Sequence, residues 1–591
     1  MRSSLTLSLF LVLLTACSER SQVSNLSTIS DVMDEVISRL YRSVSPEKYE
    51  EIDDAFILEF LSEEEKHILA TKYQYFTTNV PVVVSLMRHV DQETAPFWLE
   101  TSGFVRTDEK IISESYEYEV WQKRFDTGKV ELGINGFDKH RPVYFVSVGP
   151  QNASDELVIR DVYPAEFEVT TLEVGAFTYH DWSDLQLIEV PKSLRGQKLF
   201  TTVRGRAREA HIKGAFRKTP YPSSGKPDQV MLTWSDSPQN SIDIQWRTDT
   251  TVQDGLVRFW KAGNDEPDTL EAEASSYRMQ DRMLMNDRYI HRFTSALKNL
   301  DAGAEYFYSV GSAAYDVWSE VSSFHTAPDA DKFSFVWFGD THCFPDSGKL
   351  VNLAAKHRDA AFYSIAGDIV STGLNRDDWD RFFQHSVNAF ASKPLMPVPG
   401  NHDRQDGLGA KMYYDLFSLP KNGPKDVDSE STYAFEYGNA LFLMIDATFD
   451  IDLQTQWIEE KLQNSKAVWK FVMFHFPPYN FEEPYPEIQK AWVPLFDKYH
   501  VDMVMGGHIH YYMRSLPMKN GDVVSSFDDG TVYAISISIP SKHNNMSKER
   551  YAVKQYAEGY FYQHMEIDGS VLKYTTYDHT GAVRDEFTIK K

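Results

Sequence analysis

Near the carboxyl end of the chain, the stretch VDMVMGGHIHYYMRS (residues 501–515) is an apolar run that stops at two glycines and two histidines, His508 and His510. In an extended chain, residues two apart point to the same side, so both imidazoles could reach one cavity. Imidazole binds metals and exchanges protons near neutral pH. A His-x-His pair also occurs in surface patches, so its meaning depends on what the fold brings beside it.

Four other apolar runs stop at side chains that can bind a metal. They are FSFVWFGDTH, AFYSIAGD, LMPVPGNHD and KFVMFHFPPY. Runs that are apolar on both faces are typical of strands in a covered sheet, and the intervening LQTQWIEEKLQ has a helical pattern. Loops at the carboxyl ends of such strands gather into one site. We therefore expect one site made of Asp340, His342, Asp368, Asn401, His402, His475, His508 and His510.

This set of side chains favours a dinuclear metal centre. Carboxylate and amide oxygens mixed with imidazoles, without a thiolate, suit a pair of first-row divalent or trivalent ions better than a structural zinc site. Two ions about 4 Å apart need a bridging carboxylate. Asp368 is the natural bridge because it stands alone in its motif. A structural role could explain any one of these residues but not the series.

The first residues, MRSSLTLSLFLVLLTAC, combine one positive charge, a short apolar stretch and small residues before Cys17. This pattern predicts a signal peptide over residues 1–16. Leu14 to Cys17 resembles the bacterial lipobox, which implies lipid attachment at Cys17, a tether over residues 17–27 and, with Ser18 next, an outer-membrane lipoprotein. Ordinary cleavage after Ala16 is the alternative. Only Cys343 then remains, so no intrachain disulfide is expected.

The overall composition limits the classes of partner that the protein can bind. Acidic residues number 86 against 60 basic ones, for a net charge of −26. Such a charge argues against a nucleic-acid polymer or an anionic membrane surface as the main partner. No segment after the signal is long and apolar enough to cross a membrane. We expect a small molecule that bears a phosphate as partner and a membrane contact through the lipid alone. The sequence does not indicate the oligomeric state.

The chain reads as a multidomain α+β protein. Apolar residues at helical spacing from Ser30 onward predict helices from residue 28 to about 90, followed by strands to about 215, and this 28–215 region carries no recognised motif. After the linker KTPYPSSGKPDQ, short strands at close intervals predict a β-sandwich over residues 223–328, with Tyr306 placed for a tyrosine corner. Residues 331–591 form the domain with the buried strands.

The motifs resemble those of a known family. The order GD-x-H, GD, GNHD, a lone histidine and GH-x-H is that of the calcineurin-like metallophosphoesterases. The flanks STYAFEYGNALFLMIDAT and VMFHFPPY, with the preceding fibronectin type III-like domain, look like the purple acid phosphatases. The resemblance covers about residues 225–591 and implies a four-layer α/β/β/α catalytic domain.

The resemblance also implies a ligand set. One metal would be held by Asp340, His342, Asp368 and His510, and the other by Asp368, Asn401, His475 and His508. His402 would contact the phosphate and protonate or stabilise the leaving oxygen. Two cations of this kind neutralise phosphate oxygens and activate a hydroxide for in-line attack on phosphorus.

One position departs from the purple acid phosphatase pattern. Those enzymes carry tyrosine three residues after the bridging aspartate, as the ferric ligand that gives the colour, and usually lack histidine in the first block. Here Ser371 takes that position and His342 is present. We therefore expect a colourless enzyme, with iron, zinc and manganese all open as the metals.

Four further residues lie near the motifs. Cys343 follows His342 and, on an extended segment, would point away from the metals, which favours packing over ligation. Tyr479, Tyr511 and His543 could line a substrate pocket or be part of the core.

Taken together, the sequence predicts an exported, lipid-anchored bacterial phosphatase that hydrolyses phosphate monoesters with a metal-activated hydroxide. A phosphodiesterase or nucleotidase with the same site is the first alternative, since both use the same ligands. A surface binding protein with a vestigial catalytic domain is the second. The region 28–215 could cap the active site or select bulky substrates.

Overall fold

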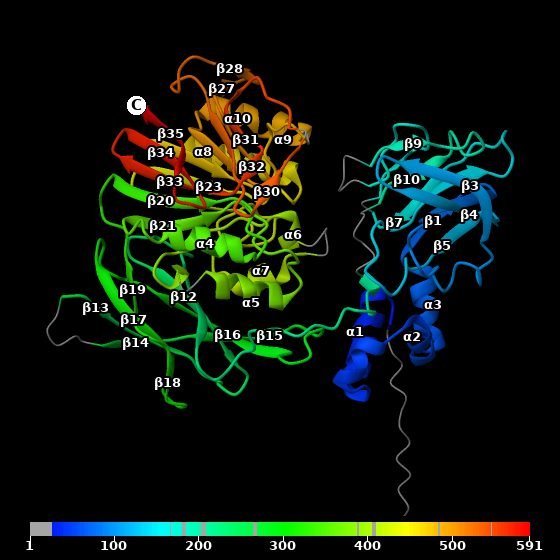
Figure 1. The fold of residues 1–591 in the computed structure, drawn as a ribbon, viewed down its shortest axis with the longest axis horizontal. Coiled ribbons are helices and arrows are strands. Elements are labelled where there is room, and N and C mark those ends of the chain that lie inside the picture. Colours follow the sequence, from blue (N-terminus) through cyan, green and yellow to red (C-terminus); the bar gives the residue numbers. More distant parts are fainter. Residues whose placement is uncertain are drawn as a thin grey trace, which may run out of the picture.

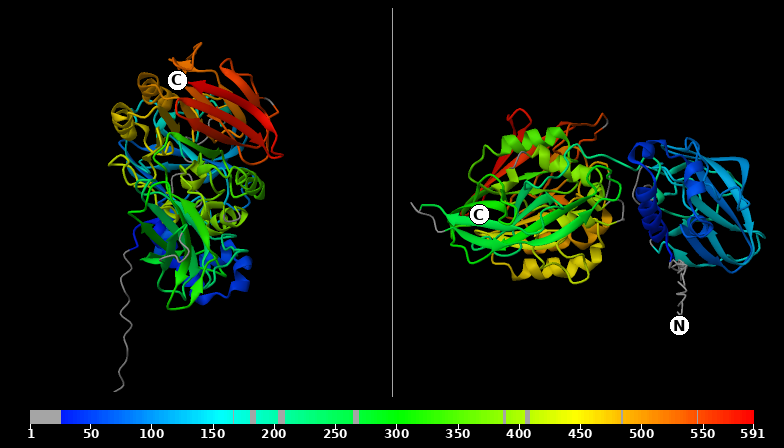
Figure 2. Two further views of the ribbon diagram at one scale, coloured as in Figure 1. Left: turned by 90° about the vertical axis from the view of Figure 1, so that its left-hand side faces the viewer. Right: turned by 90° about the horizontal axis from the view of Figure 1, so that it is seen from below.

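The computed structural model describes residues 26–165, 167–179, 185–202, 209–263, 269–386, 389–404, 409–482, 485–544 and 546–591. The expected signal peptide, Cys17 and most of the tether lie outside these residues. Three parts follow one another along the chain (Figures 1 and 2): an amino-terminal part on the right of Figure 1, and two parts stacked on each other at the left. Among the described residues, we find no helix with the length and apolar character needed to span a bilayer.

The amino-terminal part starts with helices, as the apolar spacing predicts. Helix α1 buries Val32, Val36 and Leu40 on one face, and its start is closed by a capping box between Thr28 and Asp31. A second capping box starts α3 at Ser62. The helical elements are α1 (Ile29–Ser43), η1 (Pro46–Glu51), α2 (Asp54–Phe60) and α3 (Glu63–Thr71).

The prediction of helix as far as residue 90 is wrong beyond Thr71. Strands β1 (Gln74–Thr78) and β2 (Val82–His89) occupy that stretch. The run of β-branched residues at 82–84 favours a strand, and β2 pairs on both sides, with β4 (Glu117–Phe125) and β6 (Phe145–Pro150). Tertiary pairing therefore decides the structure of a segment whose apolar residues also fit a helix.

Two sheets complete this part, in the orders β5-β1-β7 and β8-β10-β6-β2-β4-β3-β9. Val84 and Leu86 of β2 pack into the core that the helices share, whereas Met87 packs into a second core on the other face. The remaining strands are β3 (Val105–Ser113), β5 (Gly128–Leu132), β7 (Ile159–Tyr163), β8 (Val169–Thr171), β9 (Leu187–Glu189) and β10 (Lys198–Phe200).

The second part is a sandwich of two antiparallel sheets, ordered β11-β12-β16-β15 and β14-β13-β17-β18, with β19 paired to β17. Tyr306 closes the expected tyrosine corner, since its phenol oxygen accepts a hydrogen bond from the backbone N–H of Asp301 at 3.0 Å. The strands are β11 (Asp228–Thr233), β12 (Ile242–Asp249), β13 (Leu256–Lys261), β14 (Leu270–Glu273), β15 (Ser275–Gln280), β16 (Tyr289–Leu297), β17 (Glu305–Ser312), β18 (Val317–Trp318) and β19 (Ser322–His325).

The third part contains two packed sheets flanked by helices, the expected four-layer arrangement. The first has the order β21-β20-β33-β34-β35 and the second the order β22-β23-β24-β25-β29-β26-β31. The strands are β20 (Lys332–Phe338), β21 (Ala360–Ile365), β22 (Tyr433–Tyr437), β23 (Ala440–Met444), β24 (Trp469–Met473), β25 (Met503–Gly506), β26 (Tyr512–Ser515), β29 (Val532–Ile535), β31 (Ala552–Tyr556), β33 (Phe561–Asp568), β34 (Val571–Asp578) and β35 (Val583–Lys590). Two small pairs are added: β27 (Met518–Lys519) with β28 (Asp522–Val523), and β30 (Ser541–Lys542) with β32 (Glu558–Gly559). The helices are α4 (Pro345–Ala354), α5 (Arg376–His385), η3 (Ala389–Ala391), α6 (Asn401–Arg404), α7 (Lys411–Leu416), α8 (Ile451–Asn464), α9 (Pro486–Ala491) and α10 (Val493–Tyr499).

Alternate side chains of the buried strands pack into two separate cores. Phe442 of β23 faces the other sheet, where its ring centroid lies 5.1 Å from that of Phe335 on β20. Its neighbour Leu443 packs on the opposite face, in the core with Trp457 of α8 and Phe496 of α10. This is why the strand sequences are apolar at every position instead of at every second one.

The run LMPVPG (residues 395–400) does not form the regular strand that its pattern predicts. Leu395 and Val398 make only isolated parallel bridges, to Tyr363 and Ala366. Pro397 and Pro399 have no N–H to donate, so a continuous ladder cannot form here. The segment still runs along β21 and delivers its last residues to the same edge of the sheet.

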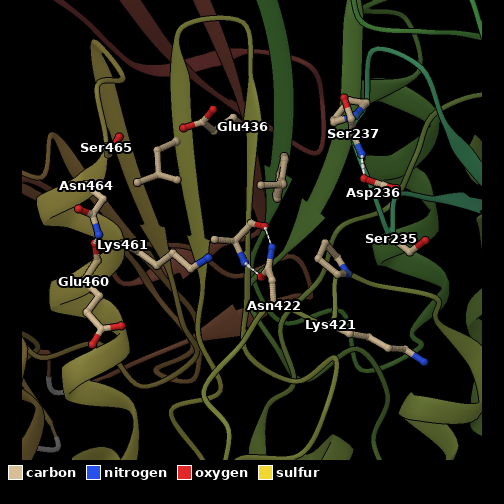
Figure 3. A pocket seen from close by; sticks show the side chains of 15 residues that line it. Ser235, Asp236, Ser237, Lys421, Asn422, Glu436, Glu460, Lys461, Asn464 and Ser465 are labelled. Atoms are coloured by element: carbon tan, nitrogen blue, oxygen red, sulfur yellow. Dashed lines mark hydrogen bonds between the residues drawn. The ribbon is translucent and has the colours of Figure 1, made fainter. Parts of the chain in front are cut away.

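A cavity of about 900 Å³ lies between the sandwich and the third part (Figure 3). Asp236, Lys421, Glu436 and Glu460 are among its lining residues. It adjoins Leu441, near the start of β23, and it is lined by none of the eight predicted site residues. This cavity is therefore separate from the predicted chemistry.

Candidate metal centre

The structure brings together all eight residues predicted to form the site. Asp340 and His342 follow β20, Asp368 follows β21, and His475 follows β24. His508 and His510 follow β25, while Asn401 and His402 begin α6. The strands that carry these side chains lie in two facing sheets, so the site lies where the edges of both sheets meet.

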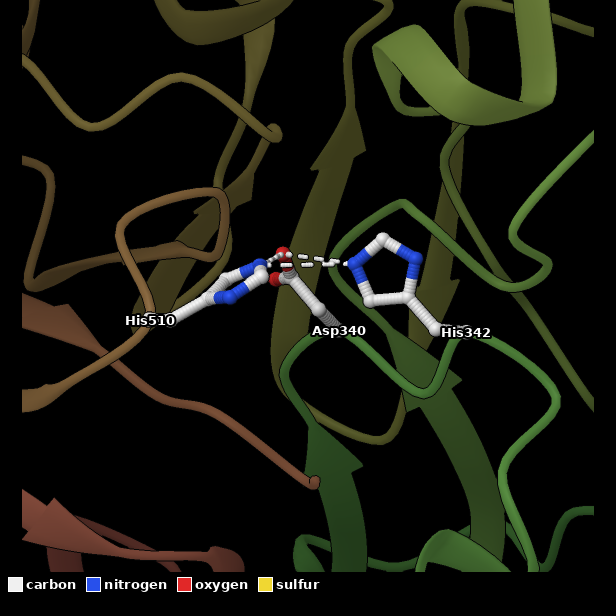
Figure 4. A group of neighbouring side chains, drawn as sticks. All are labelled: Asp340, His342 and His510. Atoms are coloured by element: carbon white, nitrogen blue, oxygen red, sulfur yellow. Dashed lines mark hydrogen bonds and ion pairs between the residues drawn. The ribbon is translucent and has the colours of Figure 1, made fainter. Parts of the chain in front are cut away.

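The first group contains Asp340, His342 and His510, with the Asp340 carboxylate between the two rings (Figure 4). Its Oδ2 atom lies 3.2 Å from Nε2 of His510 and 3.8 Å from Nε2 of His342. The two Nε2 atoms are 3.3 Å apart. Three ligand atoms thus converge on one point.

The second group contains Asp368, His475, His508 and Asn401. Oδ2 of Asp368 lies 3.3 Å from Nε2 of His475, which is 3.0 Å from Oδ1 of Asn401 and 3.2 Å from Nδ1 of His508. The same Oδ2 atom lies 3.7 Å from Nε2 of His342 in the first group. Asp368 therefore faces both groups, as a bridging carboxylate must.

His402 lies beside these groups with its ring fixed from behind. Its Nδ1–H donates a hydrogen bond to the carbonyl oxygen of Ser371 at 2.8 Å, so Nε2 is the nitrogen that is left for a ligand. Its ring centroid lies 4.7 Å from that of His342. Ser371 serves both histidines, because its hydroxyl donates to the carbonyl oxygen of His342 at 2.9 Å.

The ligand loops have strained backbones. His342, Cys343, Asp368 and His508 all have positive φ angles, of 43°, 55°, 49° and 67°. Such angles are uncommon for residues with a Cβ atom and are concentrated at functional sites. The expectation of an extended chain at His508 and at Cys343 is therefore wrong, although His508 and His510 do both lie in the metal-binding groups.

Two glycines make room for the carboxylates. A Cβ atom on Gly507 would lie 2.3 Å from Oδ1 of Asp340, and one on Gly400 would lie 2.2 Å from Oδ1 of Asp368. Any side chain at either position would displace a carboxylate. The glycines that end the apolar runs thus serve the close approach of one ligand loop to another.

Asp403 is a structural residue of the site that the sequence reasoning missed. It is fully buried and accepts hydrogen bonds from the backbone N–H groups of Gly400, Ile369 and Val370, at 2.9, 3.2 and 3.2 Å. It therefore ties the Asp368 loop to the Asn401 loop. The fourth letter of GNHD was its only signal in the sequence.

Burial and charge adjust the protonation of the site. Burial lowers the pKa of His342 to about 4, so this imidazole is neutral at pH 7. Burial alone would raise the pKa of Asp368, but the neighbouring His475 and His402 hold it well below its ordinary value. Both groups are thus in the form that a metal ligand requires.

The side chains fit a pair of metal ions. Oδ2 of Asp340 is buried and, among the described residues, has no hydrogen bond of regular geometry although Nε2 of His510 lies 3.2 Å away, an arrangement that a bound cation would stabilise. His475 donates its Nδ1–H to the carbonyl oxygen of Ala366 at 2.8 Å, which leaves Nε2 as the ring atom that faces Asp368 and Asn401. Oxygen and imidazole donors suit first-row divalent or trivalent ions. The division of ligands between two ions stays a prediction.

The four neighbouring residues have different positions. Cys343 is buried, and burial raises the pKa of its thiol to about 12, consistent with packing. Tyr511 is buried against Phe481, and Tyr479 packs on Tyr533, so both belong to the core. His543 lies next to the site, with Nε2 3.0 Å from the carbonyl oxygen of His510.

Comparison with known proteins gives two family matches. Residues 333–512 match the family described as calcineurin-like phosphoesterase, and residues 227–326 match the purple acid phosphatase N-terminal domain. The first match includes all eight site residues, and the second coincides with most of the sandwich.

Several proteins are similar to about half of the chain. A purple acid phosphatase of Glycine max is 25% identical over 325 residues, which cover 51% of this chain and 68% of that protein. The Fe(3+)-Zn(2+) purple acid phosphatase 12 of Arabidopsis thaliana is 25% identical, covering 52% and 68%. An uncharacterized protein of Mycobacterium tuberculosis is 24% identical, covering 47% and 60%. The chain thus spans about two thirds, or slightly less, of the length of these relatives.

A solved structure shares the fold. The purple acid phosphatase from yellow lupin (Lupinus luteus) seeds superposes with a TM-score of 0.52 at 15% identity, covering 88% of this chain and 93% of that one. Two domain families, the relatives and the fold agree with the motif order of the site. The chain thus contains a calcineurin-like phosphoesterase domain preceded by a purple acid phosphatase N-terminal domain, and this pair of domains, with its similarity to purple acid phosphatases, indicates a phosphoric ester hydrolase.

Proposed function

We propose that the protein hydrolyses phosphate monoesters at a dinuclear metal centre. The observation that carries the proposal is the position of Asp368, whose Oδ2 atom faces His342 on one side and His475 on the other. Two cations bound there would supply Lewis acidity that neutralises the phosphate oxygens and makes water a better nucleophile.

The protein's own residues provide orientation and a proton. Asp340, Asp368 and His475 are buried and hold their ligand atoms in place, whereas Asn401, His402, His508 and His510 are partly exposed and form the open side. A phosphate can therefore enter from the side of His402. The carbonyl of Ser371 holds His402 Nδ1, so Nε2 can carry a proton to the leaving oxygen.

A comparison of substrates tests the proposal. We expect p-nitrophenyl phosphate to be hydrolysed faster than bis-p-nitrophenyl phosphate under the same conditions. Faster hydrolysis of the diester would overturn the monoester proposal in favour of a phosphodiesterase with the same site. Bound metal without turnover of either compound would favour the binding-protein alternative.

We further propose that the chain is an exported lipoprotein, held in the outer membrane of a bacterium through lipid at Cys17. The support is the pattern of residues 1–17, a short apolar stretch followed by Leu-Thr-Ala-Cys. In a bacterial host, the full chain should fractionate with membranes and incorporate labelled palmitate. The Cys17→Ala variant should do neither, and equal behaviour of the two chains would contradict the proposal.

A further inference from the structure

A second cavity, of about 700 Å³, lies where the three parts of the chain meet. Asp34 of α1 lines it from the amino-terminal part, Tyr277 and Arg278 line it from strand β15 of the sandwich, and Lys411 lines it from α7. Its volume lies within the usual range of small-molecule sites. We call it the junction pocket.

The junction pocket adjoins the loop that holds His402. Thr372, Leu374 and Asn375 line the pocket, and they follow directly on Ser371. Ser371 holds the ring of His402 through its carbonyl, and the backbone N–H of Gly373 donates to the carbonyl oxygen of His402 at 2.9 Å. Consecutive Cα atoms are about 3.8 Å apart, so the pocket begins one residue away from the contact with His402.

The junction pocket is cationic in an acidic protein. Five lysines and arginines line it against three aspartates, although the whole chain carries a net charge of −26. Part of this charge is neutralised: Arg282 pairs with Asp34, Arg217 pairs with Asp281, and Lys411 lies 2.5 Å from Asp415. Arg217 also pairs with Asp377, at 2.8 Å, so the attraction for an anion comes chiefly from Arg278.

Arg278 is the cation best placed to meet such an anion. Its guanidinium stacks on the ring of Tyr289, 3.9 Å from the ring centroid. No carboxylate of the described part of the chain lies within ion-pair distance of it. Stacking on an aromatic face fixes the plane of the guanidinium and leaves its N–H edge for a phosphate or carboxylate.

We propose that the junction pocket binds a second anionic group on the leaving portion of the substrate. The inference rests on the proposed phosphatase activity and specifies its substrate class, namely phosphate esters whose leaving group carries a further phosphate or carboxylate. The scissile phosphate lies at the metal centre, and the second anion reaches past His402 along the 371–375 loop to Arg278. A recognition site formed by all three parts also gives the amino-terminal part a role.

Kinetics of the full mature chain test this inference. The substrates are α,ω-alkanediol bisphosphates of increasing length, each compared with the monophosphate of the same diol at constant ionic strength. We expect one length to be preferred over its monophosphate by about tenfold or more in kcat/KM, as a charge-assisted hydrogen bond provides. Arg278→Ala should abolish that preference through KM, and Arg278→Lys should retain part of it.

A matched variant controls for folding. Arg258 in β13 also stacks on an aromatic face, 3.6 Å from the ring centroid of Trp318, but it does not line the junction pocket. Arg258→Ala should leave the preference unchanged, and monophosphate turnover should be the same in both alanine variants. Equal kcat/KM on both substrate series in wild type, or equal losses in the two variants, would overturn the inference.

Two further outcomes are distinguishable. If wild type hydrolyses neither series although metal is bound, the proposed function itself fails. If inorganic phosphate changes the turnover of p-nitrophenyl phosphate, and Arg278→Ala removes that effect while the bisphosphate preference is absent, the pocket binds a free phosphate effector, and the substrate inference is overturned.

Discussion

Ser371 and His402 are joined through the main chain: the carbonyl oxygen of Ser371 accepts a hydrogen bond from Nδ1 of His402 at 2.8 Å. Purple acid phosphatases carry the colour-giving tyrosine at this position. In this chain, Ser371 occupies it, and its backbone holds His402, the histidine expected to act on the leaving oxygen. A substitution at position 371 changes the side chain but leaves this carbonyl oxygen as a hydrogen-bond acceptor. The backbone therefore fixes the tautomer of His402.

Replacing His402 should separate catalysis from metal binding. We expect His402→Ala to lower kcat on p-nitrophenyl phosphate by about 10²- to 10⁴-fold, the usual contribution of a general acid, with metal content unchanged. His385 is a matched control, because its Nδ1 lies 3.0 Å from the carbonyl oxygen of Cys343, outside the metal groups. Steady-state kinetics and elemental analysis of both alanine variants test this prediction. A large loss of kcat in His385→Ala as well would contradict the assignment of His402 as the general acid.

The bridging role of Asp368 predicts a specific metal stoichiometry. Asp368→Ala removes a ligand from both groups and should bind neither ion firmly, whereas His475→Ala should lose one ion and keep the other. His357→Ala, a histidine outside the metal groups, should keep both. Metal content by mass spectrometry after gel filtration measures this, and one retained ion in Asp368→Ala would rule out a bridge.

The protein should be colourless even when loaded with ferric iron. The visible band of a purple acid phosphatase requires a phenolate on iron, and Ser371 stands at that position. Tyr485 approaches the second group, with its ring centroid 6.1 Å from that of His508. Absorption spectra of the iron-loaded protein test the prediction. A band near the middle of the visible range that is lost in Tyr485→Phe would contradict it and identify the ligand.

Asp378 should make stability depend on pH. Burial, reinforced by Asp377, raises the pKa of Asp378 to about 6, so the folded state holds its proton more tightly than the unfolded chain. Wild-type stability should therefore fall as pH rises from about 4 to 6. The Asp378→Asn variant has no carboxyl to titrate at this position. Its free energy of unfolding, relative to that of wild type, should therefore rise by about 2 kcal/mol across that interval.

Urea unfolding of the metal-free protein at pH 4 and pH 7 measures this difference. Asp452 is the matched control, since it lies in the first turn of α8 as Asp378 lies in the first turn of α5, but it is exposed. Asp452→Asn should change the free energy of unfolding by the same amount at both pH values. A constant advantage of Asp378→Asn would mean that its carboxyl titrates normally in the fold.

The motifs predicted the site better than they predicted the fold around it. Residues after buried strands converge because the carboxyl ends of the strands share an edge, and the periodicity of the sequence reveals those strands. Sequence periodicity did not reveal that Pro397 and Pro399 interrupt the third run, or that residues 82–89 form a strand paired on both sides. The pairing of residues 82–89 depends on partners far away in the chain, whereas the interruption follows from the missing N–H groups of the two prolines, which an apolar pattern does not register.

The backbone conformation of the ligand loops could not be predicted from the sequence either. Positive φ angles at His342 and Asp368 are imposed by the surrounding contacts, among them the backbone N–H of His342 donating to the carbonyl oxygen of Asp368 at 2.9 Å. The same holds for Asp403, whose three backbone donors come from two separate loops. Local residue preferences contain no record of such contacts.

The most direct test of the account is metal-dependent turnover by the mature chain from Ser18 onward, with metal content determined on the same sample. We predict about two ions per chain and hydrolysis of p-nitrophenyl phosphate that a chelator abolishes and a first-row metal restores. Hydrolysis that persists in metal-free protein would contradict the account, and so would a chain that binds no metal.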